Sequence, residues 1–337
     1  MMEPMKIAPR LHSLPPLDPP GTVNRNRLVQ NFLDLIQVDG PTRAERQVAD
    51  TIKEQLRSMR LEAQEDDAGR KIGGNTGNLL VKVPANVEGA PRLLFAAHMD
   101  TVPLATGVQP TIGDDGVIRS DGTTALGGDN RAGCAEILEA VREILEENAP
   151  HGELQLLFTV GEEGGLLGAR ALDPARIQAD LGFVVDVLKP HQIYTQGSHL
   201  LSIPKVDLSP EGVCRAKEAA ATAPVVQPPD YLDLTEKEQE ILKFTTDAMA
   251  DVGLQPEFHS LEWAGTDAIA LRRHGLSAIS LGAGENQPHT RRESIEVEDL
   301  VKATELIRAL VRKAAAMGHG AAGAALGGVV GATLARA

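Results

Sequence analysis

Short apolar runs recur along the chain and alternate with longer segments of helical periodicity. Within each run the residues are almost continuously apolar rather than alternating with polar ones. This pattern is typical of strands that are covered on both faces of a sheet. The runs predict five strands, at Asn78–Val83, Arg92–Ala97, Leu154–Val160, Leu181–Val187 and Ser277–Leu281.

Between these runs, apolar positions recur at steps of three and four residues, which predicts amphipathic helices. The clearest helical pattern lies over Arg131–Glu147, and Glu45–Met59 and Leu300–Ala315 have the same period. Strands that alternate with helices indicate an α/β sandwich with a largely parallel central sheet.

A further helix is indicated by its boundary residues. Thr235 followed by Glu238 forms a capping-box pattern, in which each side chain bonds the main chain of the other residue. The helix is expected to run to about Val252, because Gly253 supplies a C-terminal stop.

Two segments depart from this alternation. Residues 188–234 are rich in Pro and Ala and predict an insertion over the sheet edge, with one helix beginning at Ser209-Pro210. The tail Met317–Ala337 is mostly Gly and Ala, with small residues at four-residue spacing, as in packed membrane helices. Because the tail is only weakly hydrophobic, we expect a flexible or partner-docking segment rather than a membrane span.

Composition narrows the class of protein. The chain has 337 residues, of which 42% are hydrophobic and 24% charged, as in ordinary globular proteins. Its formal net charge is −14 and it has no basic block, which argues against nucleic-acid binding. Two cysteines, Cys134 and Cys214, exclude a disulfide scaffold and a cysteine-based zinc knuckle. Residues 1–20 lack the apolar segment of a secretory signal, so we expect a cytoplasmic protein.

Possible metal ligands follow several of the predicted strands. One strand ends in His98-Met-Asp100, and strand alternation places His98 and Asp100 on the same face. A carboxylate beside a histidine can fix its tautomer for metal binding. Alone, however, a histidine at a strand end is also typical of an ordinary surface residue.

Other carboxylates occupy similar positions. Asp129 lies in a glycine-rich turn that enters a helix, where a plain N-cap is the alternative reading. The turn lacks the Gly-Lys-Ser/Thr or dinucleotide pattern that a phosphate site requires. Glu162 and Glu163 are adjacent at a strand end, and Asp186 closes another buried strand. His289 stands in a glycine-rich loop after the last strand.

Together these positions predict a metal site. In open parallel sheets, ligands bind at the carboxyl ends of the strands, where these histidines and carboxylates lie. Buried adjacent carboxylates are unfavourable unless a cation or a shared proton compensates their charge. A mixed set of histidine and carboxylate donors suits zinc, cobalt or manganese.

The chain resembles the two-metal aminoacylase/peptidase family that includes tripeptidase T, glutamate carboxypeptidase and succinyl-diaminopimelate desuccinylase. The Gly-Thr-Asp267-Ala segment and the loop before His289 are most similar to the tripeptidase branch. The matching segments, in the family's order, are His98-Met-Asp100-Thr-Val-Pro, Asp121-Gly-Thr-Thr with Gly-Gly-Asp129-Asn-Arg-Ala-Gly, Gly161-Glu162-Glu163-Gly, Asp186 and His289-Thr-x-x-Glu293.

The resemblance implies a three-layer α/β/α sandwich like that of the zinc exopeptidases. Residues 25–187 and 235–313 would form the catalytic domain, between an N-terminal extension at 1–24 and the Gly/Ala-rich tail at 314–337. Residues 188–234 would stand in place of the family's lid domain.

The resemblance also implies a pair of divalent ions, zinc first, with cobalt or manganese as alternatives. Asp129 would bridge both ions, and the peptide bond that follows it would be cis. Asp100 would orient His98, and Glu162 would be the general base toward an attacking water. The remaining ligands would be His98 and Asp186 for one ion, and Glu163 and His289 for the other.

One departure from the family concerns the lid. Residues 188–234 are too few for the usual lid of a sheet and two helices, and the family's lid histidine has no match beyond a weak one at His199. The lid normally supplies substrate-binding groups and the dimer interface. We therefore expect that the lid-type dimer does not form.

The leading functional prediction is a metal-dependent exopeptidase, an aminopeptidase or tripeptidase that acts on small peptides. An N-acyl amino acid deacylase or amidase would use the same centre. A non-catalytic metal-bearing binding protein is the third possibility, but it would not need a base such as Glu162 beside its ligands. Neither a nucleic acid nor a membrane is expected as a partner.

Overall fold

The computed structural model describes residues 21–187, 189–195, 225–226, 235–260 and 266–333. The predictions for residues 1–20, for the helix at Ser209-Pro210 and for His199 and Cys214 concern positions outside these ranges.

A six-stranded sheet forms the centre of the molecule, in the order β1-β2-β6-β3-β7-β11. Strands β6, β3, β7 and β11 are mutually parallel, whereas β2 is antiparallel to β6 and β1 to β2. All five predicted strands are present within one residue at either end, which confirms the largely parallel sheet. The strands are β1 (Gln64–Glu65), β2 (Leu79–Val83), β3 (Leu93–His98), β6 (Leu154–Thr159), β7 (Leu181–Val187) and β11 (Ala278–Gly282).

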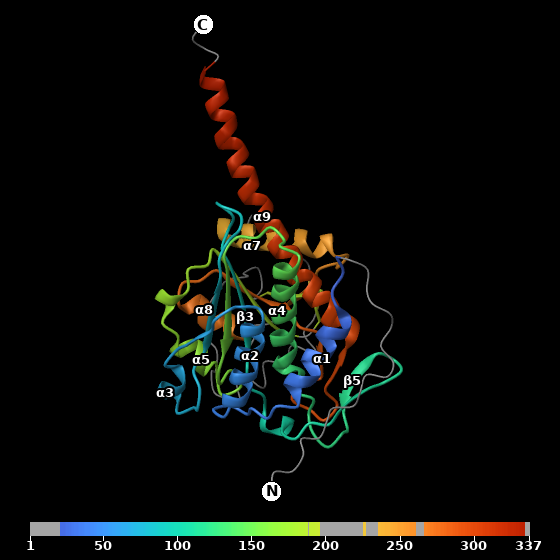
Figure 1. The fold of residues 1–337 in the computed structure, drawn as a ribbon. Helices are drawn as coiled ribbons and strands as arrows, with labels where there is room; N and C mark the ends of the chain where they lie inside the picture. The colour runs from blue at the N-terminus through green and yellow to red at the C-terminus, as the bar shows by residue number, and fades with distance from the viewer. Residues whose placement is uncertain (1–20, 188, 196–224, 227–234, 261–265, 334–337) are drawn as a thin grey trace.

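Helices cover both faces of this sheet (Figure 1). The alternation of side chains along β3 shows the two sides: Phe95 belongs to the larger core cluster and Leu94 to a separate cluster on the opposite face. The larger layer contains α1 (Arg25–Ile36), α2 (Arg46–Ser58), α4 (Gly128–Glu146), α7 (Glu236–Asp251) and α9 (Val297–Thr333). The thinner layer contains α5 (Leu167–Ala171) and α8 (Asp267–Arg273). The three-layer α/β/α prediction is therefore confirmed.

The boundaries of the predicted helices agree with their local chemistry. Thr235 and Glu238 form the predicted capping box at the start of α7, and Gly253 follows the helix with φ of 74°. The long helix α9 begins close to the predicted position but continues to Thr333, beyond the predicted end at Ala315. Its C-terminal part leaves the body of the molecule (Figure 1). No helix within the described residues combines the length and the hydrophobicity that a membrane span requires.

Smaller elements surround the central sheet. One antiparallel sheet has the order β12-β13-β5-β4. In a second sheet, of order β8-β10-β9, the two strands described within residues 188–234 pair with β10. The strands of both sheets are too short for the hydrophobic pattern to indicate. The bounds are β4 (Pro110–Ile112), β5 (Val117–Ser120), β8 (Gln192–Thr195), β9 (Val225–Val226), β10 (Glu257–Ser260), β12 (Glu285–Asn286), β13 (Ser294–Glu296), α3 (Ala68–Ile72) and the 3₁₀ turns Pro103–Ala105 and Pro174–Arg176.

Candidate metal centre

The predicted metal ligands meet at the carboxyl end of the parallel strands. His98 is the last residue of β3, and Asp186 lies near the end of β7. Glu162 and Glu163 follow β6, Asp129 lies in the first turn of α4, and His289 lies in the loop between β12 and β13. Three overlapping groups of three residues form, and within each group the ligand atoms lie within 4.8 Å of one another. The groups are His98 with Asp129 and Asp186, His98 with Glu162 and Glu163, and Asp129 with Glu163 and His289.

His98 lies at the centre of one half of the cluster. Its Nε2 atom lies 3.0 Å from Asp129 Oδ1 and 3.5 Å from Asp186 Oδ1. Glu162 Oε2 is slightly farther from the same nitrogen, at 3.7 Å. All four side chains are almost fully buried. A cation between them could therefore draw its ligands from His98, Asp129 and Asp186.

His289 forms the other half of the cluster. Its Nε2 atom lies 2.8 Å from Glu163 Oε1 and 3.0 Å from Asp129 Oδ2. The two oxygens of Asp129 therefore face two different histidines. This is the arrangement that a carboxylate needs in order to bridge two ions.

The position of Asp129 excludes the simple N-cap reading. The N-cap of α4 is Gly127, whose φ of 73° is left-handed, and Asp129 has non-helical backbone angles just inside the helix. The Asp129–Asn130 peptide bond is cis, as the family resemblance implied. The main-chain N–H of Asp129 donates to Glu293 Oε1 at 3.0 Å, and that of Gly127 donates to Glu293 Oε2 at 2.9 Å. Glu293 therefore holds the backbone that presents Asp129.

Glu162 and Glu163 lie in a turn and not in a strand, because β6 ends at Thr159. Strand alternation, which would place the two carboxylates on opposite faces, therefore does not apply to them. Both side chains reach the cluster, Glu162 toward His98 and Glu163 toward His289.

Asp100 lies directly behind His98 and is fully buried. The Nδ1 atom of His98 lies 3.0 Å from the main-chain oxygen of Asp100 and 3.3 Å from its Oδ1 atom. This placement suits the predicted orienting role. Burial alone would raise the pKa of Asp100, but hydrogen bonds and charge from His98, with further hydrogen bonds from Thr42 and the Glu162 N–H, lower it.

Two neighbouring carboxyl groups have raised pKa values. Burial raises the pKa of Glu293 to about 7, and the nearby charge of Asp129 adds to the effect. Burial likewise raises the pKa of Asp267 to about 7, although a hydrogen bond from Thr159 opposes the shift. Neither residue is among the predicted site residues. Both lie in segments that carry the family resemblance, Asp267 in Gly-Thr-Asp267-Ala and Glu293 in His289-Thr-x-x-Glu293.

The donor set fits divalent metal ions. Four carboxylates and two imidazoles are gathered in a buried space, where uncompensated negative charge is strongly unfavourable. Nitrogen and carboxylate oxygen donors in this mixture are those that zinc and similar ions prefer.

Comparison with known proteins places the chain in a family. Residues 94–313 match the model of peptidase family M20/M25/M40. The chain belongs to this family. The match spans every predicted ligand, and the predicted two-metal peptidase resemblance is confirmed.

The relatives include peptidases of the tripeptidase branch. An uncharacterised Bacillus subtilis protein, YqjE, is 27% identical over 87% of this chain and 100% of its own length. Peptidase T of Shewanella sediminis is 30% identical, over 48% of each chain. This chain thus matches about half the length of that relative.

Solved structures of similar fold extend over most of the chain. The aminopeptidase PepT from Bacillus cereus has a TM-score of 0.73 and 27% identity, covering 88% of this chain and 100% of that chain. A Staphylococcus aureus tripeptidase has the same TM-score with 23% identity, which supports the fold alone. The predictions of a metallopeptidase and of an exopeptidase of the tripeptidase type agree with these relatives.

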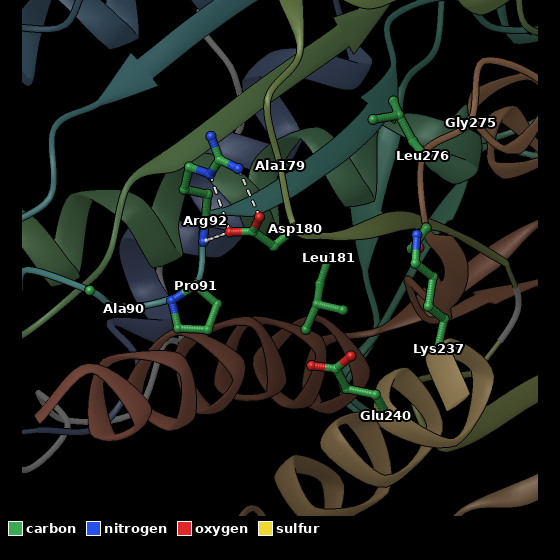
Figure 2. Close-up of a pocket in the computed structure, with 12 residues that line it drawn as sticks. Ala90, Pro91, Arg92, Ala179, Asp180, Leu181, Lys237, Glu240, Gly275 and Leu276 are labelled. Atoms are coloured by element: carbon green, nitrogen blue, oxygen red, sulfur yellow. Dashed lines mark hydrogen bonds and ion pairs between the residues drawn. The ribbon is translucent and has the colours of Figure 1, made fainter. Parts of the chain in front are cut away.

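A cavity of about 590 Å³ lies at the opposite end of the sheet from the metal centre. Arg92, which directly precedes β3, and Leu181, the first residue of β7, line this cavity, and Lys237 and Glu240 face it from α7 (Figure 2). Arg92 Nη2 donates to Asp180 Oδ1 at 2.8 Å. The cavity is therefore separated from the candidate ligands by the length of the strands.

Proposed function

We propose that this chain is a two-metal aminopeptidase that removes the N-terminal residue from short peptides. The observation that carries the proposal is the placement of Asp129 between His98 and His289, with Glu162 beside the same cluster. The names of the relatives Peptidase T and aminopeptidase PepT support the same substrate class.

The ligands divide into two sets that share Asp129. His98 and Asp186 would hold one ion, and Glu163 and His289 the other. Zinc is the metal we propose, because two imidazoles and several carboxylates match its preferred donors. When bound, the ion pair would lower the pKa of a shared water and stabilise negative charge on the scissile carbonyl oxygen.

Glu162 would act as the general base. Its carboxylate lies on the His98 side of the cluster and is fully buried, so it can take a proton from the attacking water without competing bulk solvent. The same carboxyl group can then give the proton to the departing amine nitrogen. Asp100 would keep His98 in one orientation through its contacts with Nδ1.

A hydrolysis screen tests the proposal. Tripeptides and dipeptides with free ends, with a blocked N-terminus and with a blocked C-terminus are incubated with the zinc-, cobalt- or manganese-loaded protein. We expect cleavage of peptides with a free N-terminus and no cleavage after N-acetylation. Hydrolysis of the N-acylated substrates alone would instead identify a deacylase, and no hydrolysis of any substrate would contradict both activities.

A further inference from the structure

The loop that joins α1 to α2 is docked against the metal end of the sheet. The main-chain N–H of Thr101 donates to Gly40 O at 3.1 Å, and Thr42 Oγ1 donates to Asp100 Oδ2 at 2.7 Å. The methyl group of Thr42 also lies against Gly164, where an added Cβ would come within 2.8 Å of it. Residues 40–45 therefore pack directly on the turn that carries Glu162 and Glu163.

Three consecutive N–H groups of that turn are held by two buried carboxylates. The N–H of Gly161 donates to Glu45 Oε1 at 3.0 Å. The N–H groups of Glu162 and Glu163 donate to Asp100 Oδ1 at 2.9 Å and to Asp100 Oδ2 at 3.2 Å. The backbone of the turn is thus fixed from two sides, by Asp100 behind β3 and by Glu45 from the α1–α2 loop.

Glu45 stands at the N-cap position of α2, where a short side chain such as Ser, Thr, Asp or Asn ordinarily accepts one of the first helical N–H groups. Its side chain makes no such bond. Instead, Oε1 accepts the N–H of Arg43 at 2.9 Å and that of Gly161, and the residue has no exposed surface. Burying a carboxylate is unfavourable, so its use at Gly161 and not at the helix points to a role at the metal centre.

We propose that Glu45 is a positioning residue of the metal centre. It fixes the Gly161 end of the turn, so that Glu163 reaches the ion on the His289 side and Glu162 reaches the water. The effect on Glu162 rests on the proposed function, in which Glu162 is the general base. The effect on metal affinity, through Glu163, does not depend on that function. Partners of metal ligands typically change metal affinity or activity about 10- to 100-fold when they are removed.

The test compares Glu45→Ala and Glu45→Gln with the unaltered full-length protein. Two readouts are measured: the binding of each of two Co²⁺ ions, by visible absorption, and kcat and KM on a tripeptide. Glu45→Ala leaves the Gly161 N–H without this acceptor. We therefore expect kcat and the affinity for the more weakly bound Co²⁺ ion each to fall about 10- to 100-fold, with KM nearly unchanged. Glu45→Gln keeps an oxygen that accepts this N–H, so we expect it to recover most of both losses.

A matched control is Glu143→Ala on α4. Glu143 is also a buried carboxylate that accepts a main-chain N–H, from Asn24, but it lies beside Arg308 on the outer helical layer. We expect this variant to lower stability while leaving kcat and both Co²⁺ affinities unchanged.

The outcomes separate the alternatives. If Glu45→Ala has native kcat and Co²⁺ affinity, or if Glu45→Gln is as impaired as Glu45→Ala, the positioning role is wrong. If Glu45→Ala does not fold, Glu45→Asp replaces it, because the shorter side chain withdraws the acceptor from Gly161; native Co²⁺ affinity in that variant would also overturn the proposal. If the unaltered protein cleaves no peptide, the proposed function fails, and the Co²⁺ affinities still decide the role of Glu45.

Discussion

Asp129 Oδ2 lies 3.0 Å from His289 Nε2, although the two residues come from the first turn of a helix and from a distant loop. The other oxygen of Asp129 lies equally close to His98. Asp129 therefore lies between the two histidines, and the proposed chemistry depends on its position.

We predict that the protein binds two divalent ions per chain and that Asp129→Ala loses both. The reason is that Asp129 belongs to both proposed ligand sets, whereas Asp186 and Glu163 each belong to one. Elemental analysis after loading and dialysis measures the stoichiometry. Asp186→Ala is the control and should retain the ion on the His289 side. One tightly bound ion in Asp129→Ala would contradict the prediction, because it would show that one of the two sites does not depend on this residue.

The adjacent glutamates should behave differently. Glu162→Gln is expected to lower kcat about a hundred- to ten-thousand-fold while both ions stay bound, because a positioned general base contributes about that much to the rate. Glu163→Gln should weaken one ion, and its activity should recover partly at high metal concentration. Kinetics and metal content of both variants check this. Loss of metal in Glu162→Gln with retention in Glu163→Gln would mean that the two roles are exchanged.

The free energy of unfolding should depend on pH through the protonation of Glu136, on the buried side of α4. Its carboxylate oxygens have no hydrogen-bond partner among the described residues, and burial, with the nearby charges of Glu285 and Asp299, raises its pKa well above the usual value. A raised pKa means that the folded state keeps this proton over a range where the unfolded chain releases it. The stability contributed by Glu136 is therefore full below the ordinary carboxyl pKa and is lost as pH rises toward the folded-state pKa.

Glu136→Gln removes this loss. We expect its free energy of unfolding, relative to the unaltered protein, to increase as pH rises above the ordinary carboxyl pKa, with a slope of up to about 1.4 kcal/mol per pH unit. Urea unfolding at a series of pH values measures the difference. Glu139→Gln serves as a comparison on the same helix, because Glu139 is paired with Arg27. A difference that stays constant with pH would contradict the assignment.

The short segment between Asp186 and Thr235 leads to a prediction about assembly. The family's lid-type dimer should not form, because residues 188–234 are too few to build that lid. Light scattering gives the mass, and hydrogen exchange locates any interface. A dimer protected within residues 188–234 would contradict the prediction, and deletion of 317–337 tests separately for association through the tail.

The strands and the main helices could be predicted because apolar residues are patterned so regularly. The five core strands are nearly continuous apolar runs, and the Thr235–Glu238 capping box marks α7 directly. Helix α1 is not among the predicted helices, although its sequence contains an N-cap residue and a helical spacing of apolar residues. Asn24 caps it through a hydrogen bond from the Arg27 N–H, and its buried residues recur at helical spacing.

The histidines and carboxylates that cluster at the candidate site could be predicted because the family's motifs are specific as a set, and the same motifs include Asp100 behind His98. The role of Glu45 could not be predicted. Glu45 has the sequence context of an ordinary helix start, and only the fold brings it to Gly161. The orientations of Glu162 and Glu163 could not be predicted from strand alternation either, because hydrophobic periodicity does not show that β6 ends before them.

Anomalous X-ray diffraction from zinc-loaded crystals tests the central claim most directly. The account predicts two zinc peaks, each about 2.0–2.2 Å from a different oxygen of Asp129. One peak should contact His98 and Asp186, and the other Glu163 and His289. A single peak, or two peaks of which either does not contact Asp129, would contradict the account.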